Sequence, residues 1–185
     1  PSGPEDPQLS MIKFEHLDGR PLAVLANFSM HYFGDSKISA DYFGLFCDGM
    51  EKMMEDSGGG EPVALLSHGC SGDIWRRDYM QPNPADVNID GYTQGLLQVA
   101  QGIYAGIETS AEADLAMGEM RLTLNYRTPD VQRLEWAQRI VEAMGDRLPQ
   151  TQPEIYAVEQ IYLDEMQKTE VVVQALRIGD IAIAS

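Results

Sequence analysis

The chain has 185 residues, of which 44% are hydrophobic, and its 29 acidic against 13 basic residues give a formal net charge of −16. This charge excludes a nucleic-acid partner, because such affinity comes largely from Lys and Arg that neutralise phosphates, and it disfavours anionic membrane surfaces. No run of 18 or more apolar residues occurs, so the sequence predicts no transmembrane segment. It leaves the oligomeric state open.

The first half of the chain predicts a hairpin, a helix and a strand. Two apolar segments flank Asp18-Gly19, and an Asp-Gly pair between such segments is a strong hairpin signal. Ser39 is expected to cap a helix over about 40–56, whose apolar stripe is Phe43, Phe46, Cys47, Met50, Met53 and Met54. The stretch SGGGEP ends this helix, and VALLS then predicts a short buried strand. A polar loop follows from 68 to about 88.

The second half predicts three helices and three strands. Asp90 is expected to cap a helix over about 91–108, with Tyr92, Leu96, Val99, Ile103 and Ile107 facing inward. Residues 115–127 alternate as in a strand with one wet side. Thr128-Pro129 and Pro153 open two further helices, and a hairpin around Gly179-Asp180 closes the chain.

The element order indicates an α/β or α+β fold, with a mixed sheet and helices packed on it. The chain starts without Met and ends in GDIAIAS, which is typical of mid-strand sequence. We therefore expect residues 1–185 to be one domain segment, incomplete at both ends, of a larger catalytic domain.

Two histidines follow apolar strands at the point where a loop leads to a helix. If the strands that precede His31 and His68 run parallel, both histidines lie at the sheet edge where ligands collect in α/β folds. A neutral imidazole there can bind a metal or act as a base. No close ligand pair such as HExxH accompanies them. His16 lies within a strand and is interpreted as a half-buried histidine without a function.

The stretch SHGCSGD leaves two interpretations open. A glycine-rich turn after a buried strand is the simpler one, because the closing glycine comes one residue too early for a nucleophile elbow. The alternative is a serine or cysteine hydrolase in which His68 activates Ser71 or Cys70.

The next segment, DIWRRDY, is an aromatic and basic cluster in a very acidic chain. It either lines a pocket for an anionic or amphipathic substrate or anchors its loop through Trp packing and Arg–Asp pairs.

Two stretches resemble signatures of the neutral ceramidases and their ceramidase-like bacterial relatives. LANFSMHYFGDSKISADYFG is similar to the family's Asn-Phe-x-x-His stretch followed by Ser-Ala/Gly-Asp and a glycine, here Asn27, Phe28, His31, Ser39, Asp41 and Gly44. LLSHGCSGDIW is similar to its later strand and Gly-Asp-hydrophobic segment.

This resemblance implies a zinc-dependent amidase that hydrolyses the N-acyl bond of a ceramide-like lipid or other small molecule. It also implies that the protein is secreted or periplasmic. It assigns a zinc ligand to His31 and places the remaining ligands, a His, a Glu and a Tyr, outside this chain. The other candidate residues are, for catalysis, His68 and Asp73, and, for substrate binding, Trp75 and Arg76.

One departure from the family pattern concerns Trp75. It stands where ceramidases carry a serine implicated in catalysis, followed by Pro-Asn. A zinc-hydroxide mechanism is compatible with this tryptophan, whereas a serine-nucleophile mechanism at that position is not. The alternatives are a catalytically altered binding protein and a hydrolase with a different amide or ester substrate.

Overall fold

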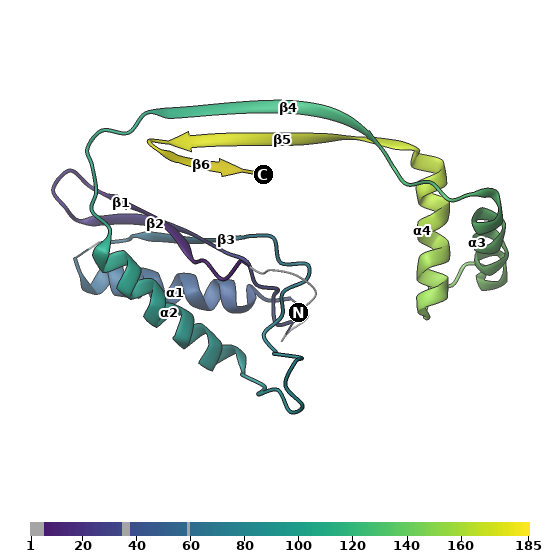
Figure 1. Cartoon of the computed structure of the whole chain (residues 1–185), viewed down its shortest axis with the longest axis horizontal. Coiled ribbons are helices and arrows are strands. Elements are labelled where there is room, and N and C mark those ends of the chain that lie inside the picture. Colours follow the sequence, from purple (N-terminus) through teal and green to yellow (C-terminus); the bar gives the residue numbers. More distant parts are fainter. Residues whose placement is uncertain (1–5, 35–37, 59) are drawn as a thin grey trace. The chain divides into compact units, whose positions relative to one another are not determined.

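The computed structural model describes residues 6–34, 38–58 and 60–185 (Figure 1). The predicted stretches around 35–37 and Gly59 therefore lie partly outside the described residues. The chain divides into two compact units, Pro1–Ala111 and Glu112–Ser185. A single domain segment over the whole chain stays a prediction, and each unit is described by itself.

The first unit is a three-stranded mixed sheet with two helices. Its strands β1 (Ser10–Glu15), β2 (Pro21–Phe28) and β3 (Val63–His68) lie in the order β1-β2-β3. β1 and β2 are antiparallel and form the predicted hairpin, whereas β2 and β3 are parallel. The helices α1 (Asp41–Asp56) and α2 (Ile89–Gly106) complete the unit. The predicted fold class, a mixed sheet with helices packed on it, is confirmed.

The core of this unit is rich in aromatic residues and methionine. Four side chains of α1 recur at helical spacing and are fully buried: Tyr42, Phe46, Met50 and Met54. They pack with apolar residues of β2, of the loop that follows it, of β3 and of α2, namely Val24, Ala26, Met30, Ala64, Leu96, Ala100 and Tyr104. The predicted stripe omitted Tyr42, and three of its members, Phe43, Cys47 and Met53, lie at the margin of the core. Burial raises the pKa of the Cys47 thiol.

The predicted N-cap residue of α2 was wrong. Asn88, not Asp90, is the N-cap residue, and its side chain accepts a hydrogen bond from Gly91 N at 2.8 Å. The buried face of the helix shifts with it, to Thr93, Leu96, Ala100 and Tyr104, and Val99 is exposed.

The other two predicted caps were also wrong. In α1 the N-cap residue is Ala40, although the Ser39 hydroxyl accepts a hydrogen bond from Asp41 N at 2.8 Å. The helix α3 (Val131–Met144) is capped by Asp130, whose carboxylate accepts from Arg133 N at 2.8 Å, and not by Thr128. A carboxylate three residues before a free N–H satisfies the first turn better than a more distant hydroxyl does.

The second unit is an antiparallel sheet and a helical hairpin. β4 (Leu115–Asn125) pairs with β5 (Lys168–Ile178) along its whole length, and β5 pairs with β6 (Ile181–Ala184). Both predicted strands and the closing hairpin are confirmed, but the expected single wet side of the first strand is not, because every residue of β4 is exposed. Between β4 and β5 the chain forms α3 and α4 (Gln152–Met166), which pack against each other (Figure 1).

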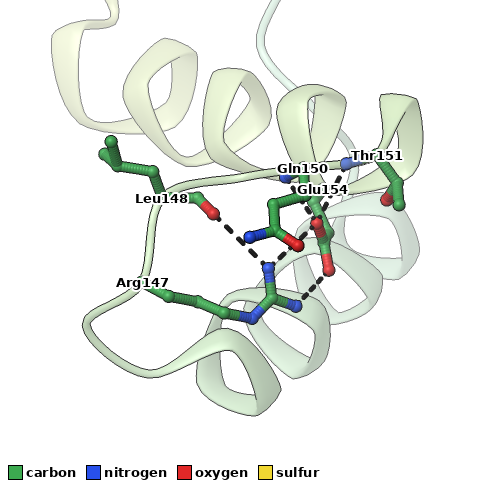
Figure 2. Close-up of polar contacts among 5 residues, drawn as sticks. All are labelled: Arg147, Leu148, Gln150, Thr151 and Glu154. Carbon is green, nitrogen blue, oxygen red and sulfur yellow. Dashed lines mark hydrogen bonds and ion pairs between the residues drawn. The ribbon is translucent and has the colours of Figure 1, made fainter.

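The turn between α3 and α4 is held by one carboxylate. Glu154 forms an ion pair with the Arg147 guanidinium and accepts hydrogen bonds from Gln150 N at 2.8 Å and Thr151 N at 3.1 Å (Figure 2). The Arg147 hydrogen bond, with smaller contributions from the two N–H groups, lowers the pKa of Glu154 to about 2. The carboxylate thus fixes the first turn of α4.

Among the described residues, no helix combines the length and the apolar character that a membrane span requires.

Candidate functional site

The parallel pairing of β2 and β3 sends both loops that carry the candidate residues to one edge of the sheet. Phe28 at the end of β2 is opposite His68 at the end of β3, and His31 lies three residues beyond Phe28. Two backbone hydrogen bonds continue the contact past the strands: Gly69 N donates to Phe28 O at 3.0 Å, and His31 N donates to Ile74 O at 3.3 Å. Because β2 and β3 are parallel, both histidines follow strands that end at the same edge of the sheet, as predicted.

His31 has one ring nitrogen engaged by the backbone. Its Nδ1 lies 3.1 Å from the carbonyl oxygen of Tyr32. Because a carbonyl oxygen only accepts, this contact requires the Nδ1–H tautomer and leaves a lone pair on Nε2. The ring is half-buried and lies against two aromatic rings, with centroid distances of 4.3 Å to Tyr32 and 5.3 Å to Trp75. An imidazole oriented in this way is suited to ligation through Nε2.

The loop after His31 is tied to the start of α1 by the Asp41 carboxylate. Oδ1 accepts hydrogen bonds from Phe33 N at 2.9 Å and Tyr42 N at 2.8 Å, and Oδ2 accepts from Gly34 N at 2.9 Å. Asp41 holds this position at φ +54°, in the left-handed region that non-glycine residues seldom occupy. We call the carboxylate and these three N–H groups the Asp41 anchor.

His68 contacts a serine and a backbone carbonyl. Its Nε2 lies within hydrogen-bonding distance of the Ser71 hydroxyl and 3.1 Å from Met30 O. The Met30 carbonyl also accepts from the Tyr42 hydroxyl at 2.8 Å, and burial raises the pKa of that phenol. Ser71 is itself buried, with 8% of its surface exposed. This cluster joins the end of β3 to α1 beneath the residue that precedes His31.

Gly69 permits the close approach of these two loops. A Cβ atom at this position would lie 2.3 Å from the Ser29 hydroxyl oxygen and 3.2 Å from Asn27 Oδ1. Both atoms belong to β2 or its extension, so a larger residue would push β2 and the β3 loop apart. This close backbone approach explains a glycine at position 69.

The segment DIWRRDY lies between the histidine loop and a carboxylate. Asp73, the first residue of this segment, is exposed and lies in a turn. The Arg76 guanidinium carbon lies 4.5 Å from the ring centroid of Phe33 and 4.6 Å from that of Trp75. Arg77 donates to both oxygens of Asp86, whereas Arg76 Nε is 3.6 Å from the same carboxylate. Trp packing and Arg–Asp pairs thus both anchor this loop.

A hollow of about 500 Å³ is lined by residues between Tyr32 and Phe43, and neither histidine is part of its lining. Its walls include Tyr32, whose ring contacts His31, and Phe43, whose ring centroid is 5.1 Å from that of His68. The remaining lining residues are Gly34, Ile38, Ser39, Ala40 and Asp41. The lining combines apolar and aromatic side chains with the polar side chains of Ser39 and Asp41, and its apolar part suits a hydrocarbon portion of a ligand.

The described residues contain no group of three or more His, Cys, Asp or Glu side chains that could hold a metal ion. His31 fits a zinc site as one ligand, because its Nε2 carries a lone pair while Nδ1 is bonded to a carbonyl. His68 Nε2 is occupied by Ser71 and Met30.

Sequence reasoning did not show that the Asp41 carboxylate joins the loop after His31 to the start of α1. A signal existed in the Ser39-x-Asp41 spacing before a helix, but the acceptance of two N–H groups from seven and eight residues upstream depends on the folded loop. The contact of Arg76 with Phe33 joins residues 43 positions apart and has no local signal.

The fold resembles a known enzyme structure. Over 97% of this chain it matches the crystal structure of neutral ceramidase from Pseudomonas aeruginosa, with a TM-score of 0.55 and 18% sequence identity. The chain spans 34% of the length of that structure. No family model and no curated protein matches the sequence. The comparison establishes a ceramidase-like fold for this chain.

Proposed function

We propose that the chain forms part of the catalytic region of a zinc-dependent hydrolase that cleaves an N-acyl amide bond of a ceramide-like substrate. The observation that carries the proposal is His31, with Nδ1 bonded to the Tyr32 carbonyl and Nε2 available at the carboxyl edge of two parallel strands. The ceramidase-like fold supports the same site. The remaining zinc ligands belong to polypeptide outside these 185 residues.

Zinc at such a site lowers the pKa of bound water and polarises the amide carbonyl. The residues of this chain orient and enclose the reacting group. The Tyr32 carbonyl fixes the tautomer of His31, and Trp75 and Tyr32 restrict the plane of its ring. The hollow beside Tyr32 and Phe43 offers apolar surface to the acyl chain.

Zinc content of the full-length polypeptide tests this assignment. His31→Ala should reduce bound zinc from one ion per molecule to less than a tenth, by elemental analysis after dialysis. His16→Ala is the matched control. The prediction of a half-buried strand position for His16 was wrong, because this residue follows β1, is exposed, and donates its backbone N–H to Arg20 O in the β1–β2 turn. Unchanged zinc content in His31→Ala refutes the ligand assignment.

The contact between Ser71 and His68 favours a second candidate, a serine hydrolase. That chemistry requires His68 Nε2 to accept the Ser71 proton. The Met30 carbonyl, 3.1 Å from the same nitrogen, instead favours the Nε2–H tautomer. Activity that survives a chelator and is lost in Ser71→Ala would support the serine hydrolase; activity lost with the chelator would support the zinc enzyme.

Trp75 at the position of the family's catalytic serine motivates a third candidate, a catalytically altered protein that binds a lipid, glycan or protein. The tryptophan ring lies 5.3 Å from that of His31, where it occupies space beside the proposed metal. Turnover of any member of a panel of N-acyl and ester substrates by the full-length protein would exclude this candidate.

A further inference from the structure

Arg76 is a cation enclosed by protein without a full set of partners. Its side chain is 17% exposed, and Nε and Nη1 are buried without a hydrogen-bond partner among the described residues. A guanidinium stays protonated at any physiological pH and carries five N–H donors. Burial of such donors without acceptors opposes folding, so a residue of this kind calls for an explanation.

The neighbours of Arg76 satisfy its apolar surface rather than its donors. Phe33 and Trp75 each lie within 4.6 Å of the guanidinium carbon, a distance at which an aromatic ring attracts a cation. Neither ring provides an acceptor in the plane of the N–H groups. The two rings therefore hold the guanidinium in place and leave its N–H edges for a polar partner.

The nearby carboxylate of Asp86 does not fill this role. Arg77 forms hydrogen bonds with both of its oxygens, one of them from Nε at 3.0 Å, whereas Arg76 Nε is 3.6 Å away, beyond hydrogen-bonding distance. Two guanidinium groups thus share one carboxylate. Locally the three groups retain one positive charge in a chain whose net charge is −16.

The position of Arg76 connects this charge to the candidate site. Trp75 lies between Arg76 and His31 and contacts both side chains. Phe33 follows Tyr32, which contacts His31 through its ring and lines the hollow. The segment from 69 to 88 contains no strand or helix, and binding of an anion by Arg76 requires this loop to move so that the buried N–H edges become exposed.

We propose that Arg76 binds a carboxylate on the substrate, so that the site takes N-acyl amino acids in preference to N-acyl amino alcohols. A planar carboxylate matches the fork of N–H donors on a guanidinium, which a neutral hydroxyl does not. The substrate class rests on the proposed amide hydrolysis but replaces the amino alcohol of a ceramide-like substrate by an amino acid, whereas the binding of the anion does not depend on that hydrolysis.

The test uses Trp75 as the reporter. The chain has 2 tryptophans, so Trp136→Phe leaves Trp75 as the sole one. This protein is titrated with N-dodecanoylglycine, N-dodecanoylethanolamine and dodecyl phosphate below their micellar concentrations. We expect a saturable change in fluorescence with the acylglycine, at a Kd at least tenfold lower than with the neutral ethanolamide. Equal affinities would overturn the proposal.

Variants assign the preference to one side chain. Arg76→Gln should bring the two Kd values together, and Arg76→Lys, which keeps the charge but not the fork, should weaken acylglycine binding about tenfold. Arg20→Gln, which replaces an exposed arginine paired with Asp18, should keep the preference. If Arg76→Gln does not fold, Arg76→Lys decides: an unchanged preference there overturns the role of Arg76.

The remaining outcomes separate this proposal from the function above. A lower Kd for dodecyl phosphate than for the acylglycine would overturn the carboxylate assignment, and a higher one would support it. Fluorescence binding needs neither metal nor turnover. A protein that prefers the acylglycine but has no zinc and no amidase activity refutes the proposed function and supports the anion site.

Discussion

Substitutions at Asp41 measure how strongly the loop beyond His31 is held. Asp41→Ala removes an acceptor of three N–H groups, two of which join this loop to α1. Hydrogen bonds to a charged group contribute about 1.5–3 kcal/mol each, so losing the two long-range ones at the lower value costs about 3 kcal/mol. An alanine at φ +54° adds strain of about 1 kcal/mol, giving about 4 kcal/mol in total.

Two further substitutions divide this cost. Asp41→Gly also loses the acceptors but relieves the strained φ, so it should cost about 1 kcal/mol less than Asp41→Ala. Asp41→Asn can keep the bonds of Oδ1 to Phe33 and Tyr42 and tolerates the left-handed region, so its cost should be about 1.5 kcal/mol. The loss of stability should therefore be smallest for Asp41→Asn, larger for Asp41→Gly and largest for Asp41→Ala.

Urea unfolding followed by circular dichroism measures these differences as changes in the free energy of unfolding. Asp48→Ala is the control, because Asp48 is an exposed residue of the same helix and should shift stability by less than about 0.5 kcal/mol. The Asp41 anchor would be refuted by an Asp41→Ala protein as stable as this control. An alanine variant less costly than the glycine variant would refute the strain at φ +54°.

Three other substitutions test parts of the fold away from the histidines. The pKa of Glu154 falls from 4.5 to about 2 on folding, so its contribution to stability is present above pH 4.5 and disappears as the pH falls toward 2. The melting temperature of Glu154→Gln should therefore vary less with pH across that range than that of the original protein. An unchanged dependence of the melting temperature on pH would contradict the role of the Arg147 pair. Gly49→Ala should destabilise the α1–α2 contact by about 1–3 kcal/mol in urea, since its Cβ would lie 2.5 Å from a Leu97 methyl. Gly102→Ala, on the exposed side of α2 with open space around it, should stabilise by about 0.5–1 kcal/mol, and changes of the same sign in both glycine variants would be inconsistent with the packing described.

The elements that sequence predicted well are those with a local signal. The Asp18-Gly19 pair fixes the first hairpin and Gly179 the last, both at positive φ as such turns require. Caps were less predictable, because several polar residues compete within a few positions and only the folded backbone selects one. Asn88 and Asp130 took the roles assigned to Asp90 and Thr128 for this reason.

The candidate site was predictable only in part, because its geometry depends on long-range pairing. Sequence placed His31 and His68 at strand ends, and the parallel register of β2 and β3 brings both to one edge. It did not show that Ser71 and Met30 occupy Nε2 of His68. Whether His31 binds zinc stays a prediction.

The buried methionines of the core allow opening of the first unit to be measured by oxidation. The thioethers of Met30, Met50 and Met54 are at most 3% exposed, whereas Met80 and Met117 are 69% and 61% exposed. Peroxide converts exposed methionine to the sulfoxide, a polar group that an apolar core does not accommodate. Met80 and Met117 should thus be oxidised at once when peroxide is added. Oxidation of Met50 and Met54 should be slow, and its rate should report how often the first unit opens.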